Sequence, residues 1–138
     1  MRLPPPGHLG ARHRLLLAAE ILAAYVPLLR ALRREDIPTL AGRARAPGRA
    51  PQPVAASSQQ ATAIRLGSIV AQVLAPLPTD NRCLIQSVVL LRVLARRSIA
   101  AELLIGVELR PSFTAHAWLE RDGQALLPAL GFEPTTRL

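Results

Sequence analysis

The sequence contains no lysine, little sulfur and few aromatic side chains. Its 138 residues include one cysteine, one tryptophan, one tyrosine and two phenylalanines. A single cysteine cannot form an intramolecular disulfide, which fits a reducing cytoplasm. Because aromatic rings are scarce, the core must be built from Leu, Ile, Val and Ala. Half of the residues are hydrophobic, which is enough for one domain with a modest core.

Several kinds of functional site are excluded by missing residues. Metal ligation needs more histidines, cysteines or paired carboxylates than the folded-looking part of the chain supplies. A glycine-rich phosphate loop with its lysine is absent, and so is the elbow motif of a serine triad. We therefore expect no metal and no cofactor.

The net charge of +8 is carried by arginine alone. The excess of Arg, Ala, Pro and Leu is typical of a GC-rich genome, and this bias explains part of the basicity. Recruitment of an acidic partner or a membrane surface would explain the rest. We do not expect a nucleic-acid partner, because stacking aromatics and a recognisable binding module are missing.

The N-terminal half predicts one long apolar helix. Residues 1–10 are rich in proline and glycine and predict irregular structure, whereas residues 11–34 have a helical pattern. A membrane span is one interpretation, but the apolar run is barely long enough, and Glu20 and Pro27 interrupt it. A signal peptide fits poorly, because no small-residue cleavage site follows the run. We expect a core helix that lies against a partner or a membrane surface.

Residues 41–56 have the composition of a solvated linker, because glycine and proline alternate with arginine. The linker divides the chain into a segment 1–56, with the hydrophobic helix, and a core 57–138, within one compact domain overall. Ser57 or Ser58 is expected to cap the next helix, which Pro76 ends.

The cysteine begins another predicted helix. Asp80 is a good N-cap, so Cys83 falls in the first turn, where unpaired backbone N–H groups and the helix dipole favour a thiolate. The helix is expected to end near Arg96 and Arg97. Cys83 is therefore a candidate nucleophile, although a lone cysteine is more often a small buried hydrophobe.

A nucleophilic thiol needs a base within hydrogen-bond reach. His8 and His13 lie in the irregular N-terminal segment, so His116 is the candidate general base. A cysteine on a helix followed by a histidine on a strand is the order of parts in papain-like enzymes. The competing interpretation is that His116 is an ordinary strand residue.

Three strands follow the cysteine helix. Residues 101–109 predict the first strand, His116 opens the second, and Asp122-Gly123 predicts a hairpin before a weaker strand from Gln124. Helices followed by strands in series predict an α+β fold, with a helical N-terminal half and the cysteine helix packed on a small antiparallel sheet.

The second half of the chain resembles lasso-peptide maturation protein B, whose peptidase domain belongs to the transglutaminase-like superfamily. The resemblance is carried by ordered motifs that cover the cysteine helix and the strands. These motifs are Asn81-Arg82-Cys83-Leu84, Leu94-Ala95-Arg96-Arg97, residues 101–107, Ala115-His116-Ala117-Trp118-Leu119-Glu120 and Asp122-Gly123.

The resemblance implies a transglutaminase-like, papain-like fold and a cytoplasmic cysteine peptidase with Cys83 as nucleophile and His116 as base. Such an enzyme removes the leader of a ribosomally made precursor peptide. A separate leader-recognition protein and an ATP-dependent lasso cyclase would be its partners, and peripheral membrane contact stays open. The alternatives are a catalytically inactive scaffold and a basic membrane-associated protein in which Cys83 is merely buried.

The acidic residue that the family places twelve positions after the histidine is replaced here by Pro128. If residues 121–123 form a three-residue loop, residue 120 pairs with 124 and Pro128 lies opposite His116. The orienting role is then lost, or is supplied by a register shift, by Glu133 or by a backbone carbonyl. This register predicts weak activity that Pro128→Asp would raise. Glu120 and Asp122 lie too far along the strand to serve.

Overall fold

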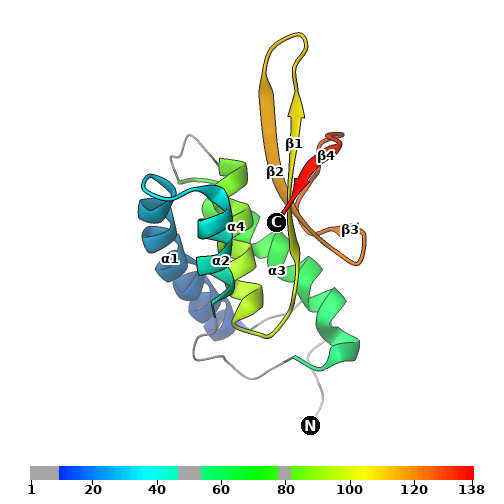
Figure 1. The fold of residues 1–138 in the computed structure, drawn as a ribbon. Coiled ribbons are helices and arrows are strands. Elements are labelled where there is room, and N and C mark those ends of the chain that lie inside the picture. The colour runs from blue at the N-terminus through cyan, green and yellow to red at the C-terminus, as the bar shows by residue number, and fades with distance from the viewer. Residues whose placement is uncertain (1–9, 47–53, 78–81) are drawn as a thin grey trace.

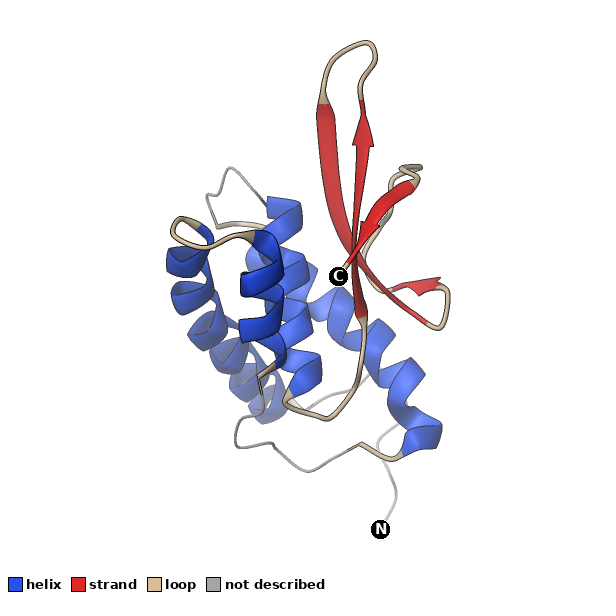
Figure 2. Cartoon of the chain, viewed as in Figure 1, coloured by secondary structure: helices blue, strands red, loops and turns tan. Residues whose placement is uncertain are grey.

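A four-stranded antiparallel sheet stands beside a group of helices (Figures 1 and 2). The structure, a computed structural model, describes residues 10–46, 54–77 and 82–138, and within these ranges it contains four α-helices and four strands. The helices are α1 (Ala11–Leu32), α2 (Ile37–Arg45), α3 (Gln59–Leu74) and α4 (Arg82–Ala95), and a 3₁₀ turn, η1 (Ala56–Ser58), precedes α3. The strands are β1 (Glu102–Glu108), β2 (Thr114–Arg121), β3 (Gln124–Ala125) and β4 (Pro134–Arg137), in the order β3-β2-β1-β4. The predicted α+β class is confirmed.

The cysteine-bearing helix α4 is the centre of the molecule. The other three helices pack against it, and it also contacts β1 and β2. A helix that is apolar on all sides is stable only when it is surrounded. The buried residues of α4 are Ile85, Ser87, Val88, Val89, Leu90, Leu91, Val93 and Leu94. The predicted packing of this helix on the sheet is confirmed.

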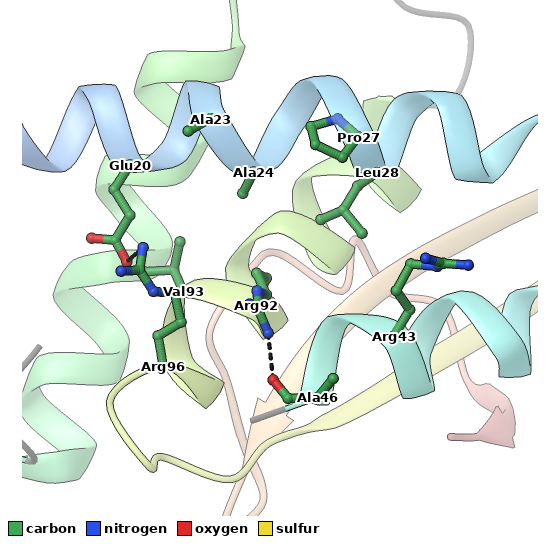
Figure 3. A pocket seen from close by; sticks show the side chains of 10 residues that line it. All are labelled: Glu20, Ala23, Ala24, Pro27, Leu28, Arg43, Ala46, Arg92, Val93 and Arg96. Carbon is green, nitrogen blue, oxygen red and sulfur yellow. Dashed lines mark hydrogen bonds and ion pairs between the residues drawn. The ribbon is translucent and has the colours of Figure 1, made fainter. Parts of the chain in front are cut away.

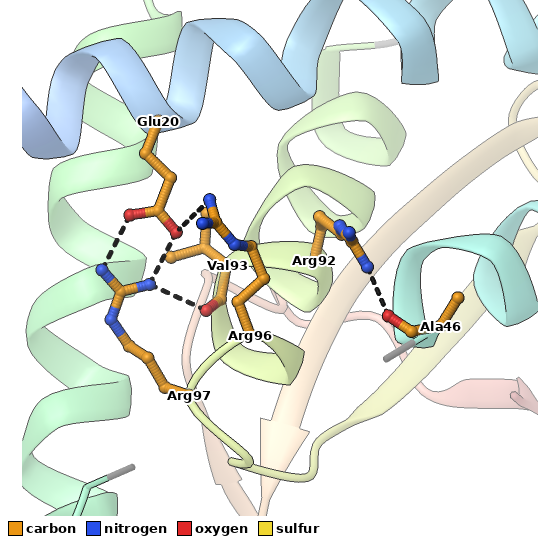
Figure 4. A network of polar contacts seen from close by, with 6 residues as sticks. All are labelled: Glu20, Ala46, Arg92, Val93, Arg96 and Arg97. Atoms are coloured by element: carbon orange, nitrogen blue, oxygen red, sulfur yellow. Dashed lines mark hydrogen bonds and ion pairs between the residues drawn. The ribbon is translucent and has the colours of Figure 1, made fainter. Parts of the chain in front are cut away.

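Helix α1 packs through one face, and its single carboxylate is ion-paired. Its buried residues, spaced three or four apart, are Leu17, Ile21, Tyr25 and Leu28. Arg97 donates from both terminal nitrogens to Glu20, each at 2.8 Å, and Arg96 lies 3.2 Å from the same carboxylate (Figure 4). The Glu20 and Arg97 side chains are only 12% and 15% exposed. The residue that interrupts the apolar run therefore joins α1 to the end of α4.

Glu20→Gln is expected to destabilise the fold by about 2–3 kcal/mol, because it leaves the largely buried Arg97 guanidinium beside a neutral partner. Glu102→Gln is the matched control, since the Glu102–Arg137 pair is 59% exposed on both sides and should contribute less than about 0.5 kcal/mol. Urea unfolding followed by circular dichroism measures both variants. Equal effects of the two substitutions would contradict a structural role for the Glu20 pair.

Helix α2 corrects the linker prediction. Asp36 caps this helix by accepting a hydrogen bond from the Thr39 N–H at 2.8 Å. Hydrogen bonds from the Thr39 side chain and backbone hold the pKa of the Asp36 carboxyl below its usual value. The predicted solvated linker is therefore wrong for residues 41–45, which lie inside a capped helix with a buried face, and residues 47–53 lie outside the described part of the chain. That face consists of Leu40, Ala41 and Ala44.

The β2–β3 hairpin has a tighter turn than the sequence suggested. Asp122 and Gly123 have φ angles of 51° and 76°, and Glu120 pairs with Ala125. Two successive residues with positive φ are typical of a two-residue hairpin turn. The predicted three-residue loop, with its pairing of 120 and 124, is wrong, and a different geometry must bring Pro128 to His116.

A fourth strand, β4, was not predicted. It pairs antiparallel with β1 at the sheet edge opposite β3, and all four of its residues are exposed. Strands are usually recognised in a sequence by alternating apolar and polar residues. A fully exposed strand that begins with proline lacks this alternation. Because β3 and β4 lie at opposite edges, the chain between them, residues 126–133, crosses the sheet. We call this stretch the crossing segment.

Candidate active site

Cys83 lies in the first turn of α4, as predicted, and is half-buried. Backbone N–H groups in the first turn of a helix have no partner within the helix, and the positive end of the helix dipole lies there. The buried hydroxyl of Ser87, one turn further along α4, donates to the Cys83 carbonyl at 2.7 Å. The predicted cap, Asp80, lies outside the described residues.

His116 is the third residue of β2 and lies opposite Gly106 of β1. Its imidazole contacts two aromatic rings: the Trp118 ring is stacked with the centroids 5.7 Å apart, and the Phe132 ring is tilted at 5.3 Å. Trp118 is buried, and its indole N–H donates to Glu120 at 2.8 Å. The imidazole plane is therefore held by neighbours from β2 and from the crossing segment.

The crossing segment also supplies a hydrogen-bond acceptor. The His116 Nε2 lies 2.6 Å from the Pro128 carbonyl oxygen. Because a carbonyl can only accept, Nε2 carries the proton and donates it, which leaves Nδ1 as the nitrogen able to exchange a proton with a thiol. Of the alternatives for the orienting group, the structure contains the backbone carbonyl.

None of the acidic side chains considered as a partner for His116 is hydrogen-bonded to its imidazole within residues 82–138. Glu120 accepts from the Trp118 indole, and Asp122 is exposed at the tip of the hairpin. Glu133 is exposed, and no hydrogen bond joins it to His116 within residues 82–138. Pro128 reaches the imidazole because the chain leaves the β3 ladder after Leu126 and turns across the sheet, not because it pairs opposite His116.

The structure brings the elements that bear Cys83 and His116 together. Helix α4 packs on β2, and its first turn lies at the same end of the molecule as the first half of that strand (Figure 1). Within residues 82–138, no hydrogen bond joins the Cys83 thiol to the His116 imidazole. Catalytic hydrogen bonds are often long in unliganded enzymes and tighten when substrate binds.

His13 lies in the first turn of α1, inside the helix predicted for residues 11–34 and not in an irregular segment, and it is exposed. Among the described residues, no three His, Cys, Asp or Glu side chains are grouped so that they could hold a metal ion. His8 lies outside the described part of the chain.

A cavity of about 440 Å³ between α1, α2 and α4 is lined by three arginines (Figure 3). Each of them has a partner: Arg43 pairs with Glu35, Arg92 donates to the Ala46 carbonyl, and Arg96 pairs with Glu20. The Glu35 carboxylate raises the pKa of Arg43 above its usual value. The contacts of Arg92 and Arg96 join α4 to the end of α2 and to α1, and neither Cys83 nor His116 lines the cavity.

The comparison with protein families gives one result. Residues 22–135 match the transglutaminase-like superfamily, from the middle of α1 into β4. No match was found among curated proteins or among solved structures. The superfamily includes cysteine proteases, and the match covers most of the chain, including Cys83 and His116. The chain therefore belongs to the transglutaminase-like superfamily.

Proposed function

We propose that the chain is the leader peptidase of lasso-peptide biosynthesis, with Cys83 as nucleophile and His116 as general base. The observation that carries the proposal is the His116 geometry: a strand histidine in a superfamily that includes cysteine proteases, with Nε2 donating to a fixed carbonyl and Nδ1 left for the thiol. The resemblance of residues 115–120 and of the Cys83 segment to lasso-peptide maturation protein B supports the finer assignment.

The reaction proceeds by acyl transfer. Nδ1 of His116 takes the Cys83 proton, the thiolate attacks the scissile carbonyl carbon, and the N–H groups at the start of α4 stabilise the oxyanion. The imidazolium gives its Nδ1 proton to the leaving amine, which departs and leaves a thioester. Water, deprotonated by Nδ1, then attacks the thioester and releases the second product and the thiol.

The proposed peptidase acts together with other molecules. A precursor peptide is the substrate, a separate recognition protein presents the leader, and an ATP-dependent cyclase uses the freed core peptide. The protein would act in the cytoplasm. Alone it would be a poor peptidase, because its substrate is delivered by the recognition protein.

The direct test incubates the purified protein with candidate precursors, recognition protein and cyclase, and follows the masses of the products. Cleavage between leader and core that requires both this protein and the recognition protein is the expected result. Full activity of the isolated chain at low micromolar precursor would contradict the proposed division of labour. If the protein cleaves no lasso precursor but does cleave other peptides, it is a cysteine peptidase with a different substrate.

A catalytically inactive scaffold is the second candidate function. The observation that favours it is the lack of a hydrogen bond between Cys83 and His116 within residues 82–138, together with the replacement of the expected acid by Pro128. A thiol-reactive probe separates the two functions: fast labelling of Cys83 below pH 7 indicates a reactive thiolate, and negligible labelling indicates a structural thiol.

The main-chain acceptor has consequences for substitutions at position 128. Pro128→Ala keeps the carbonyl, and Glu133→Gln removes only an exposed carboxylate, so both should retain kcat/KM within about threefold, the scale of a surface substitution. Pro128→Asp should give no increase in kcat/KM, because the carbonyl already accepts the hydrogen bond from Nε2. The sequence-based prediction of an increase depended on the three-residue loop, which is not present. Leader-removal kinetics measure all three variants. A tenfold gain in kcat/KM for Pro128→Asp corresponds to about 1.4 kcal/mol of transition-state stabilisation. It would mean that a carboxylate reaches the imidazole and orients it better than the carbonyl does.

A further inference from the structure

Helix α1 presents an apolar face to solvent, on the side opposite its packed face. Leu15, Leu22 and Val26 are 72%, 43% and 47% exposed, and Ala19 between them is also exposed. Their spacing of four, seven and eleven residues places them on one side of the helix. Figure 1 shows α1 on the side of the helices that is remote from the sheet. We refer to these four residues as the α1 outer stripe.

Arginines flank the stripe at both ends. At 100° per residue, Arg12 and Arg30 lie about 60° from Leu15, and Arg33 follows at the end of the helix. All three are exposed, and none forms an ion pair or side-chain hydrogen bond within the described residues. The only acid in α1, Glu20, is turned inward to Arg97. The outer side of the helix is therefore apolar in its middle and purely cationic at its ends.

This helix passes the length and composition criterion for a membrane span, with a mean hydropathy of 1.9 over its most apolar window. Spanning would require Glu20 to leave its arginines and the packed face to leave α4, which opposes insertion. A helix that keeps its inner face on the protein can instead lie along a membrane, with its outer face at the boundary between headgroups and acyl chains.

The arginines at the ends of the stripe indicate which kind of partner binds there. Two copies of α1 facing each other would place Arg12 against Arg30 if antiparallel, or each arginine against itself if parallel, and both arrangements bring like charges together. An anionic lipid surface neutralises all three arginines while the stripe is withdrawn from water. We propose that the α1 outer stripe docks the protein peripherally on an anionic membrane surface. Docking of this kind uses neither Cys83 nor His116, so it is independent of the peptidase chemistry.

The test is co-sedimentation of the full chain with vesicles of phosphatidylcholine alone or mixed with phosphatidylglycerol. We expect binding to the mixed vesicles, weakened by added salt, and little binding to phosphatidylcholine. The combined variant Leu15→Ser, Leu22→Ser, Val26→Ser should lose at least about tenfold in partitioning, because apolar area withdrawn from water supplies the anchoring. The double variant Arg30→Gln, Arg33→Gln should reduce binding to the mixed vesicles and leave binding to phosphatidylcholine vesicles unchanged.

The control is Leu109→Ser with Phe113→Ser, which removes apolar side chains that are 73% and 70% exposed from the ends of the β1–β2 connection. It should bind as wild type does, and circular dichroism checks that each variant is folded. Failure of the wild type to bind, or equal loss in the control, overturns the proposal. A dimer that the stripe variant abolishes, without vesicle binding by the wild type, would assign the face to a second copy instead.

Discussion

Cys83→Ala is expected to abolish leader removal while leaving the fold intact. The substitution removes only the sulfur of a half-buried side chain, and alanine is the best helix former, so α4 should still begin at Arg82. Without the thiol, no acyl intermediate can form, and the loss in kcat should be on the order of 10⁶, as for other covalent nucleophiles. Mass spectrometry of the precursor after prolonged incubation measures the residual cleavage.

Two controls separate chemistry from folding. Thermal unfolding of Cys83→Ala should match that of the wild type, and His116→Gln should be nearly as inactive, because the base and the nucleophile act as a unit. A Cys83→Ala protein that still cleaves would exclude the proposed peptidase mechanism. If the wild type and both variants support lasso formation equally well, the scaffold function is the correct one.

Gly106→Ala is expected to cost both stability and activity. A Cβ at this position would lie 2.7 Å from the Glu133 carbonyl oxygen, 2.8 Å from the Phe132 Cβ and 3.2 Å from the Trp118 ring. Because β1 is hydrogen-bonded to strands on both sides, the crossing segment has to move instead, at a cost of about 2–3 kcal/mol. The same movement displaces the groups that orient His116, so kcat should fall more than the folded fraction does.

Two other glycines complete the comparison: Gly67 also packs against the crossing segment, and Gly42 is the control. A Cβ at Gly67 would collide with the carbonyl oxygen of Leu126, the first residue of the crossing segment, so Gly67→Ala should also destabilise the fold. A Cβ at Gly42, on the exposed side of α2, would meet no atom within 4 Å, so Gly42→Ala should stabilise by up to about 1 kcal/mol. Urea unfolding and cleavage rates measure all three variants. If the activity of Gly106→Ala falls only as far as its folded fraction, the crossing segment does not orient His116.

The elements that sequence periodicity predicted are those with a clear buried face. Helix α1, the cysteine helix, β1 and β2 were all expected close to their observed positions, because apolar residues recur at the period of each element. The position of Cys83 in a first turn followed from Asp80 as the expected N-cap ahead of that apolar pattern. The superfamily match, residues 22–135, covers the cysteine helix and both strands.

The elements that the sequence did not reveal lack such a pattern. Helix α2 is short and contains Gly42 among arginines, so its composition resembled a linker although Asp36 and Pro38 marked its start. Strand β4 is wholly exposed. The acceptor for His116 could be named only as one of several alternatives, because a main-chain carbonyl is present at every residue and no residue type identifies it.

The crossing segment has a consequence for how the site tolerates change. A carbonyl acceptor does not depend on the side chain of its own residue, so the residue type at position 128 is free to vary while the bond to His116 persists. An insertion or deletion of a single residue between β3 and β4 would instead bring a different carbonyl, or none, to the imidazole. The orientation of the histidine is thus specified by the length of a connection rather than by the identity of a residue.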